Sequence, residues 1–148
     1  MNATVSFERS HDILIDAPAQ AVYDYVTNPN TWPEWIAASH QIDCPNRPLR
    51  KGETFDEKWQ TRAEVMLHWT VLDSDPHRLW VATANTGFIG PIVVQYTFVP
   101  EGGGTRYTRT VRNPARPKAP TPEMIERIDA EAATALQNIK RNVERQVR

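Results

Sequence analysis

The stretch that decides the fold is residues 121–143, TPEMIERIDAEAATALQNIKRNV. Its apolar side chains recur at spacings of three and four for about six turns, which is typical of one long amphipathic helix. The members of this stripe are Ile125, Ile128, Ala132, Leu136, Ile139 and Val143. Thr121 is placed to cap the helix, with Pro122 in the first helical position. We expect this helix to cover one face of a sheet.

The sequence between residues 38 and 113 lacks helical periodicity and alternates with period two instead. Turn residues divide it into successive runs, which predict an antiparallel meander. The predicted strands are residues 40–44, 53–61, 63–71, 78–85, 92–98 and 105–113, with turns at 73–77 and 101–104. The inward face of 78–85 stays open, because Leu79/Val81 and Trp80/Ala82 are equally plausible inward pairs.

The N-terminal part predicts one more strand and two short helices. Residues 4–15 alternate like a half-buried strand, although Arg9 and His11 fall on its apolar parity. Either the strand bulges there or both polar groups face inward. Asp16 fits the cap of the first short helix. Residues 30–36, NTWPEWI, hold two tryptophans three positions apart and predict a short capping helix.

Length and composition indicate one domain over residues 1–148. The chain has 40% hydrophobic residues, a formal charge of −1 and one cysteine. A chain of this size buries roughly 70% of its unfolded surface, so it needs no disulfide or metal for stability. The sequence shows no leader and no apolar stretch near the ~20 residues of a membrane helix, so we expect a cytoplasmic location. Five Trp, four Tyr and four Phe must then be buried within one core.

Charge is unevenly distributed along the chain. Residues 1–104 carry 7 basic and 13 acidic side chains, whereas residues 105–148 carry 10 and 5. Half of those ten basic side chains lie on the long helix, which favours a solvated helix face over a nucleic-acid surface. The four histidines and Cys44 lack the spacing of metal ligands, and no phosphate loop, dinucleotide motif or nucleophile elbow is present. We expect no metal and no cofactor.

Three local motifs follow one another along the chain in a characteristic order. They are Ile15-Asp16-Ala17-Pro18 followed by Val22-Tyr23, Asn28-Pro29 followed by Trp32-Pro33-Glu34-Trp35, and Gly103-Gly104-Thr105-Arg106-Tyr107-Thr108. With the order of the elements, this resembles the START-like or SRPBCC superfamily, which includes polyketide cyclase/dehydrase-like proteins. The resemblance implies an α+β helix-grip fold: a seven-stranded curved antiparallel sheet wrapped around a long C-terminal helix, with two short helices after the first strand. It also implies a cavity between sheet and helix that binds an apolar ligand.

Two charged residues, Glu57 and Arg109, lie on the inward parity of their strands. Buried charged groups form ion pairs, contact water or take part in function, so both residues are candidate polar anchors for a ligand. Burial that raises the pKa of Glu57 would suit this residue to act as a general acid or base. The alternatives are a structural ion pair and a one-residue register slip that places both in water. His11 is a third catalytic candidate, with a satisfied structural histidine as its alternative.

The candidate ligand-binding residues share the inward parity, the helix stripe or a position at one end of the sheet. They are Trp35, Phe55, Glu57, Trp59, Leu67, Trp69, Phe88, Tyr96, Tyr107, Arg109, Ile128, Ala132 and Leu136. The aromatic members either stack on a ligand or fill an ordinary core. Phe88 lies in an apolar loop between two glycines. Its position indicates a gate over the mouth of the cavity, a dimer contact or a side chain that folds back onto the core.

Three functions remain open at this stage, because the fold alone does not fix function. The first is binding of a hydrophobic or aromatic small molecule, lipid-like or polyketide-like, between sheet and helix. The second is a cyclase or dehydratase-like enzyme that moves a proton with its polar cavity groups. The third is a co-chaperone-like protein-interaction domain. We expect no nucleic-acid partner and no integral membrane association, and a homodimer is left open.

Overall fold

The computed structural model describes residues 3–60 and 64–147 and contains seven strands, two α-helices and one 3-10 helix in that part of the chain. Their bounds are β1 (Val5–Ile15), α1 (Ala19–Val26), η1 (Pro29–Glu34), β2 (Ser39–Asp43), β3 (Thr54–Gln60), β4 (Glu64–Asp75), β5 (Leu79–Thr86), β6 (Gly90–Glu101), β7 (Gly104–Arg116) and α2 (Pro122–Gln146). The order of elements is the predicted one.

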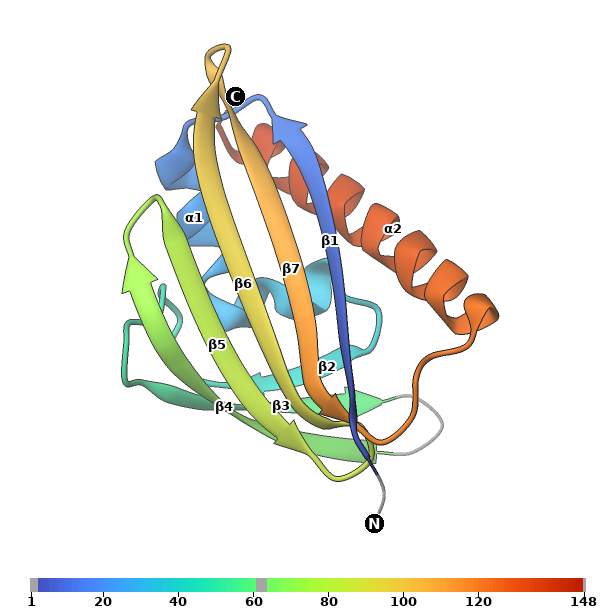
Figure 1. Ribbon diagram of the computed structural model, residues 1–148. Helices are drawn as coiled ribbons and strands as arrows, with labels where there is room; N and C mark the ends of the chain where they lie inside the picture. Colours follow the sequence, from blue (N-terminus) through green and yellow to red (C-terminus); the bar gives the residue numbers. More distant parts are fainter. Residues whose placement is uncertain (1–2, 61–63, 148) are drawn as a thin grey trace.

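The strands form one antiparallel sheet in the order β1-β7-β6-β5-β4-β3-β2. Strands that follow each other along the chain are neighbours, except that β1 pairs with β7. The sheet is strongly curved, and α1, η1 and α2 lie on its inner side (Figure 1). The predicted helix-grip fold is therefore confirmed.

Helix α2 begins as the sequence predicts. Thr121 Oγ1 accepts a hydrogen bond from Met124 N at 3.1 Å, and Pro122 follows as the first helical residue. The apolar stripe is buried only from its middle onward, at Ala132, Ala135, Leu136, Ile139 and Val143. Ile125 and Ile128 are only half-buried. The first turns of α2 therefore pack less tightly than the rest of the helix.

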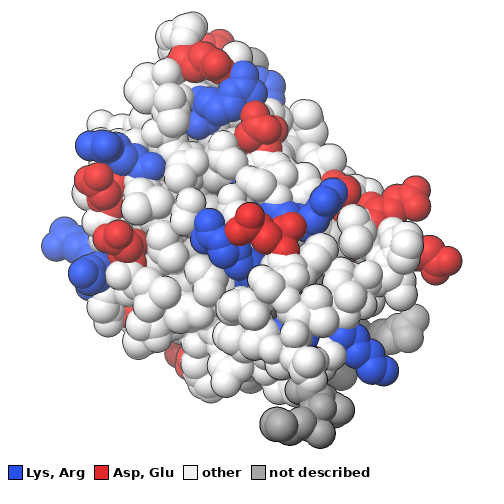
Figure 2. All heavy atoms as spheres, viewed as in Figure 1, with Lys and Arg blue, Asp and Glu red and all other residues white. Residues whose placement is uncertain are grey.

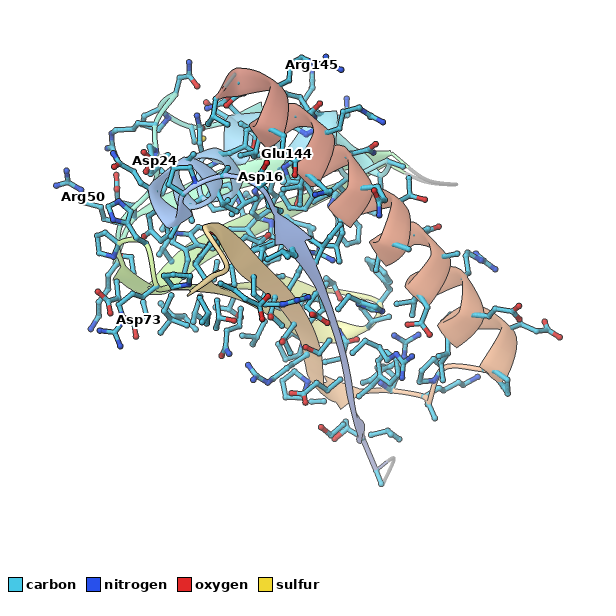
Figure 3. The ribbon with its side chains drawn as sticks, turned by 90° about the horizontal axis from the view of Figure 1, so that it is seen from above. Asp16, Asp24, Arg50, Asp73, Glu144 and Arg145 are labelled. Atoms are coloured by element: carbon cyan, nitrogen blue, oxygen red, sulfur yellow. The ribbon has the colours of Figure 1, made fainter. Side chains whose placement is uncertain are left out.

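The C-terminal turns of α2 are fixed to the end of β1. Lys140 Nζ donates to the carbonyl oxygen of Leu14 at 3.0 Å, and Asp16 N donates to Glu144 Oε2 at 2.8 Å. Figure 3 shows Glu144 beside Asp16 at this point. The backbone N–H of Asp16 is thereby satisfied, and α1 begins only at Ala19, with the extended Pro18 at its cap. The prediction of Asp16 as the helix cap is wrong, because the cap position is two residues further on, at Pro18, which has no side-chain cap hydrogen bond.

Strand β4 is longer than predicted. It continues to Asp75, with a bulge between Val71 and Asp73 that leaves Leu72 exposed. The extra residue lets the strand keep its pairing with β5 through a segment that reads as a turn in the sequence. Strand β7 similarly runs on to Arg116, beyond its predicted end at residue 113. The predicted strand ends at residues 61 and 63 lie outside the described residues.

The inward face of β5 is now assigned. Trp80, Ala82, Ala84 and Thr86 are buried, and Trp80 Nε1 donates to the carbonyl oxygen of Leu49 at 2.9 Å. Leu79 and Val81 lie on the outer face but are still half-buried. A central strand with apolar residues on both faces gives no clear alternation, which explains the ambiguity in the sequence.

The outer face of the sheet carries charge as ion pairs. Arg106 pairs with Asp12 and Glu101, and Arg112 pairs with Glu8. Figure 2 shows basic and acidic atoms next to each other on this face, with wide uncharged areas between them. Neighbouring opposite charges cancel at a distance, so these ion pairs add little net charge to this face.

Candidate functional site

The concave side of the sheet holds a cluster of aromatic rings. Its members are Trp32, Trp35, Phe55, Trp69, Trp80, Tyr96, Phe98 and Tyr107. We call this group the aromatic cluster. Trp32 lies at its centre and meets four other rings edge-on, with centroids 5.3 to 6.1 Å apart. Edge-to-face packing is the preferred arrangement of such rings.

The two tryptophans of the cluster that do not come from strands are fixed by η1. Asn28 Oδ1 accepts from Asn30 N at 3.2 Å and so caps this short helix. Trp32 Nε1 then donates to the carbonyl oxygen of Val26 at 3.0 Å, and Trp35 Nε1 donates to Thr31 Oγ1 at 3.2 Å. Both indole N–H groups are satisfied locally, so the rings are held over the sheet without help from a ligand.

The predicted ligand-binding residues occupy three different environments. Most are buried in or against the aromatic cluster: Trp35, Phe55, Glu57, Leu67, Trp69, Tyr96 and Tyr107, with Ala132 and Leu136 on the helix side. Trp59, Arg109 and Ile128 are half-buried at its margin. Phe88 stands apart, 50% exposed in the loop between β5 and β6. The predicted residues are therefore divided between the core, its margin and an exposed loop.

Glu57 on β3 is a buried carboxyl group with one free oxygen. It is 1% exposed, and its Oε1 accepts from Trp69 Nε1 at 2.9 Å. Its Oε2 has no hydrogen-bond partner among the described residues. Burial raises the pKa of Glu57, an effect that Ser39, Trp69, Trp59 and, to a smaller extent, the charge of Arg109 only partly offset. Glu57 is therefore biased toward the protonated form, which can donate.

Arg109 on β7 is a half-buried cation that lies against an aromatic ring. Its Cζ is 5.7 Å from the ring centroid of Trp35. Its Nε is buried, and neither this atom nor the hydroxyl groups of Tyr96 and Tyr107 has a hydrogen-bond partner of good geometry in the described part of the chain. The guanidinium group nevertheless lies close enough to the Tyr96 hydroxyl group to lower its pKa through its charge and a side-chain hydrogen bond. Burial raises the pKa of Tyr96 to about 12, so its hydroxyl group keeps its proton and can donate.

The charges of Glu57 and Arg109 influence each other but do not form an ion pair in the described part of the chain. Strands β6, β5 and β4 separate them along the sheet, and the curvature of the sheet brings the two charges within electrostatic reach. The sequence left their pairing open. The result is a guanidinium group whose buried Nε remains available to an acceptor.

Seven buried polar atoms of the described residues lack a hydrogen-bond partner. They are Ser39 Oγ, Glu57 Oε2, Trp59 Nε1, Tyr96 OH, Tyr107 OH, Arg109 Nε and Asn113 Nδ2. Leaving such a group unpaired costs about 1 to 3 kcal/mol, and folded proteins contain few of them. Three of the seven atoms donate only, and three hydroxyl groups can donate. Ser39 and Trp59 face the carboxyl group of Glu57, whose pKa they lower, so the donors that are not directed at a carboxyl group are those of Tyr96, Tyr107, Arg109 and Asn113.

A second polar group joins β1 to α2. Arg9 and His11 both face inward, where they meet Asp129 of the helix. Arg9 Nε donates to Asp129 Oδ1 at 3.0 Å, and His11 Nε2 lies 2.8 Å from the same oxygen. The register of β1 is regular at these two positions, so the predicted alternative of inward-facing polar groups holds and the bulge does not. Sequence reasoning missed Asp129, although two inward basic side chains call for an acidic partner.

Two hollows on the outer surface lie away from this interior. One of about 350 Å³ is lined by Gln41, Asp43, Asp56, Lys58 and Met66, with Ile42. The other, of about 340 Å³, follows the last turns of α2. Neither is lined by any of the seven unpartnered atoms.

The raised pKa of Glu57 makes stability depend on pH. The unfolded chain releases this proton near the ordinary value of 4.5, whereas the folded protein keeps it to higher pH. The contribution of Glu57 to the free energy of unfolding is therefore fully present below pH 4.5 and is lost as pH rises through the raised pKa. Glu57→Gln stays neutral and keeps an acceptor for Trp69, so it should be more stable than the wild type at pH 8. The gain should be about 1.4 kcal/mol for each pH unit by which the pKa of Glu57 in the folded protein exceeds its ordinary value.

Urea unfolding between pH 4 and pH 8 measures this difference. The two proteins should converge at pH 4, where the wild-type carboxyl group is also neutral. If the free energy of unfolding of the wild type changes with pH in parallel with that of the variant, Glu57 ionises as freely in the folded protein as in the unfolded chain.

Known proteins resemble this chain in sequence. The family described as polyketide cyclase / dehydrase and lipid transport matches residues 4–144. A curated protein of Penicillium ochrochloron, Penitrem biosynthesis cluster 1 protein I, is 32% identical over 127 residues, which cover 80% of this chain and 82% of that protein. Of the helices in the described residues, none is long and apolar enough to span a bilayer.

Solved structures share the fold at low identity. The ZhuI aromatase/cyclase of Streptomyces sp. R1128 has a TM-score of 0.72 and 16% identity, with 97% of both chains covered. The di-domain ARO/CYC protein StfQ of the steffimycin pathway has a TM-score of 0.76 and 13% identity, covering 97% of this chain and 52% of that one. The fold defines a helix-grip protein of the START-like/SRPBCC superfamily. Within it, the chain belongs to the polyketide cyclase / dehydrase and lipid transport family.

Proposed function

We propose that this protein binds an aromatic or polyketide-like molecule rich in carbonyl oxygens at the concave face of its sheet. The observation that carries the proposal is the set of unpartnered donors around Arg109, next to the rings of Trp35 and Tyr96. A ligand with acceptor oxygens on an aromatic framework would accept hydrogen bonds from these donors and pack against these rings. A saturated hydrocarbon chain would leave the same donors unpaired at a cost of about 1 to 3 kcal/mol each.

Access to this site is proposed from the side of the first turns of α2. There the helix stripe is only half-buried at Ile125 and Ile128, whereas Ile139 and Val143 are fully buried. The C-terminal turns are also held to the end of β1 by the hydrogen bonds of Lys140 to Leu14 and of Asp16 to Glu144. The N-terminal half of the helix is held to β1 only at Asp129, by Arg9 and His11, among the hydrogen bonds of the described residues. A displacement of the first turns therefore breaks fewer apolar contacts than one of the last turns.

A second function, a cyclase or dehydratase activity, is favoured by the chemistry of Glu57. A buried carboxyl group with a raised pKa and one free oxygen is suited to donate a proton, while Arg109 would polarise a carbonyl group. The names of the aromatase/cyclase structures and of the Penicillium relative, a protein of penitrem biosynthesis, support a role in the metabolism of such molecules.

The proposal is tested with two probes of nearly equal size, 2-acetylnaphthalene and 2-ethylnaphthalene, which differ by one carbonyl oxygen. Titration calorimetry measures their dissociation constants. We expect the ketone to bind about 10- to 100-fold more tightly, because a hydrogen bond to a charged donor contributes about 1.5 to 3 kcal/mol. Equal affinity, or no binding of the ketone at millimolar concentration, would contradict the proposed function.

A further inference from the structure

We propose that Asn113 is a second recognition point of the concave face, which binds an acceptor oxygen at the far end of an elongated ligand whose first oxygen lies at Arg109. The inference rests on the proposed function and narrows its ligand class to long molecules with an acceptor oxygen at each end. Two observations carry it: the unpartnered amide group of Asn113, and its place on the same strand and the same face as Arg109.

The side chain of Asn113 is buried with an unused donor. It is 5% exposed, and its Nδ2 has no hydrogen-bond partner among the described residues. An amide N–H group that leaves water without finding an acceptor destabilises the folded protein, so folded proteins contain few of them. An acceptor oxygen supplied by a ligand would remove this defect.

Asn113 faces the same side of the sheet as Arg109. The two residues are four positions apart on β7, and side chains alternate between the two faces of a strand with period two. The pairing of β7 with β1 is regular between them, with Arg109 opposite His11 and Asn113 opposite Phe7. At about 3.3 Å per residue, their Cα atoms are about 13 Å apart. A ligand must therefore be elongated to reach both side chains.

The surface between the two donors is apolar. Val111 lies midway between them on β7, and Val94 of β6 and Ala82 of β5 continue the same row across the sheet. Val94 and Ala82 are buried. Arg9, which is opposite Val111 on β1, is already engaged with Asp129 of α2. This row offers apolar contact to the middle of a ligand, and the polar contacts lie at its two ends.

Asn113 lies at the end of the sheet where α2 begins. Three positions further along β7, Arg116 Nη2 lies 3.1 Å from Met124 Sδ in the first turn of α2. The Cζ of Arg116 is also 6.0 Å from the ring centroid of Phe7, the neighbour of Asn113 on β1. Access to the site is proposed from this side. A ligand that enters there with one ketone leading reaches Arg109 with that end and leaves its other end at Asn113.

Two long probes of nearly equal shape test the second recognition point. 4,4′-Diacetylbiphenyl has a ketone at each end of a rigid framework, whereas 4-acetyl-4′-isopropylbiphenyl has a ketone at one end only. Titration calorimetry on the full-length protein measures both dissociation constants. We expect the diketone to bind about tenfold more tightly, which corresponds to about 1.4 kcal/mol and is typical of one added hydrogen bond.

A shorter pair of probes tests the spacing. 1,4-Diacetylbenzene and 4-isopropylacetophenone differ from each other in the same way, but a single benzene ring separates their substituents. A short diketone held at Arg109 does not extend to Asn113, so the two short probes should bind within about twofold of each other. A tenfold preference in the short pair as well would place the second donor close to Arg109 and overturn the role of Asn113.

Asn113→Leu tests whether this side chain causes the preference. Leucine has nearly the same shape and no donor, so the variant should bind the two long probes within about twofold of each other. Comparing two probes on one protein cancels a general effect of the substitution on the fold. Arg112→Met is the matched control, at the adjacent position on the outer face, and should keep the preference of the wild type. Thermal unfolding checks that Asn113→Leu is folded, and Asn113→Ala replaces it if it is not.

The outcomes separate this inference from the proposed function. If the wild type binds the one-ketone probe but prefers the diketone by no more than about twofold, the second recognition point is wrong and the proposed function stands. A tenfold preference that survives in Asn113→Leu would overturn the assignment to Asn113. If no ketone probe binds, 2-acetylnaphthalene included, the proposed function fails and this inference fails with it.

Discussion

Arg109→Met should weaken the binding of 2-acetylnaphthalene about 10- to 100-fold and leave the binding of 2-ethylnaphthalene unchanged. The guanidinium group has a buried, unpartnered Nε and lies against Trp35. Methionine keeps much of the apolar length of the side chain and removes every donor. The loss therefore falls on the ligand that needs a donor, and calorimetric titration of both probes into both proteins measures it.

The stability of this variant separates binding from folding. Because the structure shows Arg109 in no ion pair among the described residues, removing its charge leaves no carboxylate newly unpaired, apart from a weaker influence on Glu57. The control is Arg112→Met, three positions further along β7, where the side chain pairs with Glu8 on the outer face. It should bind both probes like the wild type. Equal weakening by both variants would contradict a specific role for Arg109.

Trp32→Ala should destabilise the protein by about 3 to 5 kcal/mol, the range for removing a large aromatic side chain from a core. Trp32 is 1% exposed and touches Trp35, Phe55, Trp69 and Trp80. The substitution also removes the donor to the carbonyl oxygen of Val26. A loss of this size is a large part of the 5 to 15 kcal/mol that holds a typical domain together.

Urea unfolding followed by circular dichroism measures this loss. Trp32→Phe keeps a ring at the centre of the cluster and should lose less, which keeps the test usable if the alanine variant does not fold. Met66→Ala, at an outer-face position that is 52% exposed, should stay within about 0.5 kcal/mol of the wild type. A Trp32→Ala protein within 1 kcal/mol of the wild type would mean that the aromatic cluster does not organise the core.

The fold was predictable because the two periodicities in the chain do not conflict. The three- and four-residue spacing after Thr121 gives α2, and the alternation between residues 38 and 113 gives the meander. Sequence reasoning failed where a local signal competes with pairing. The acidic segment at Asp73 and Asp75 reads as a turn, yet a bulge lets β4 continue through it.

The site was predictable only in part. Parity correctly indicated that Glu57 and Arg109 face the interior, because alternation fixes which face a side chain takes. Parity does not give the curvature that brings β3 and β7 within electrostatic reach of each other. Nor does it identify Asp129 as the partner of His11, because the two are 118 positions apart and meet only when α2 packs on β1.

The measurement that tests the central claim most directly is a crystal structure of the complex with 2-acetylnaphthalene. The account predicts the naphthalene ring on the concave face near Trp35, with the ketone oxygen about 2.7 to 3.2 Å from a donor atom of Arg109, Tyr96 or Tyr107. A ketone seated instead in the outer hollow between Asp56 and Met66, or one bound on the concave face with its oxygen away from these donors, would contradict it.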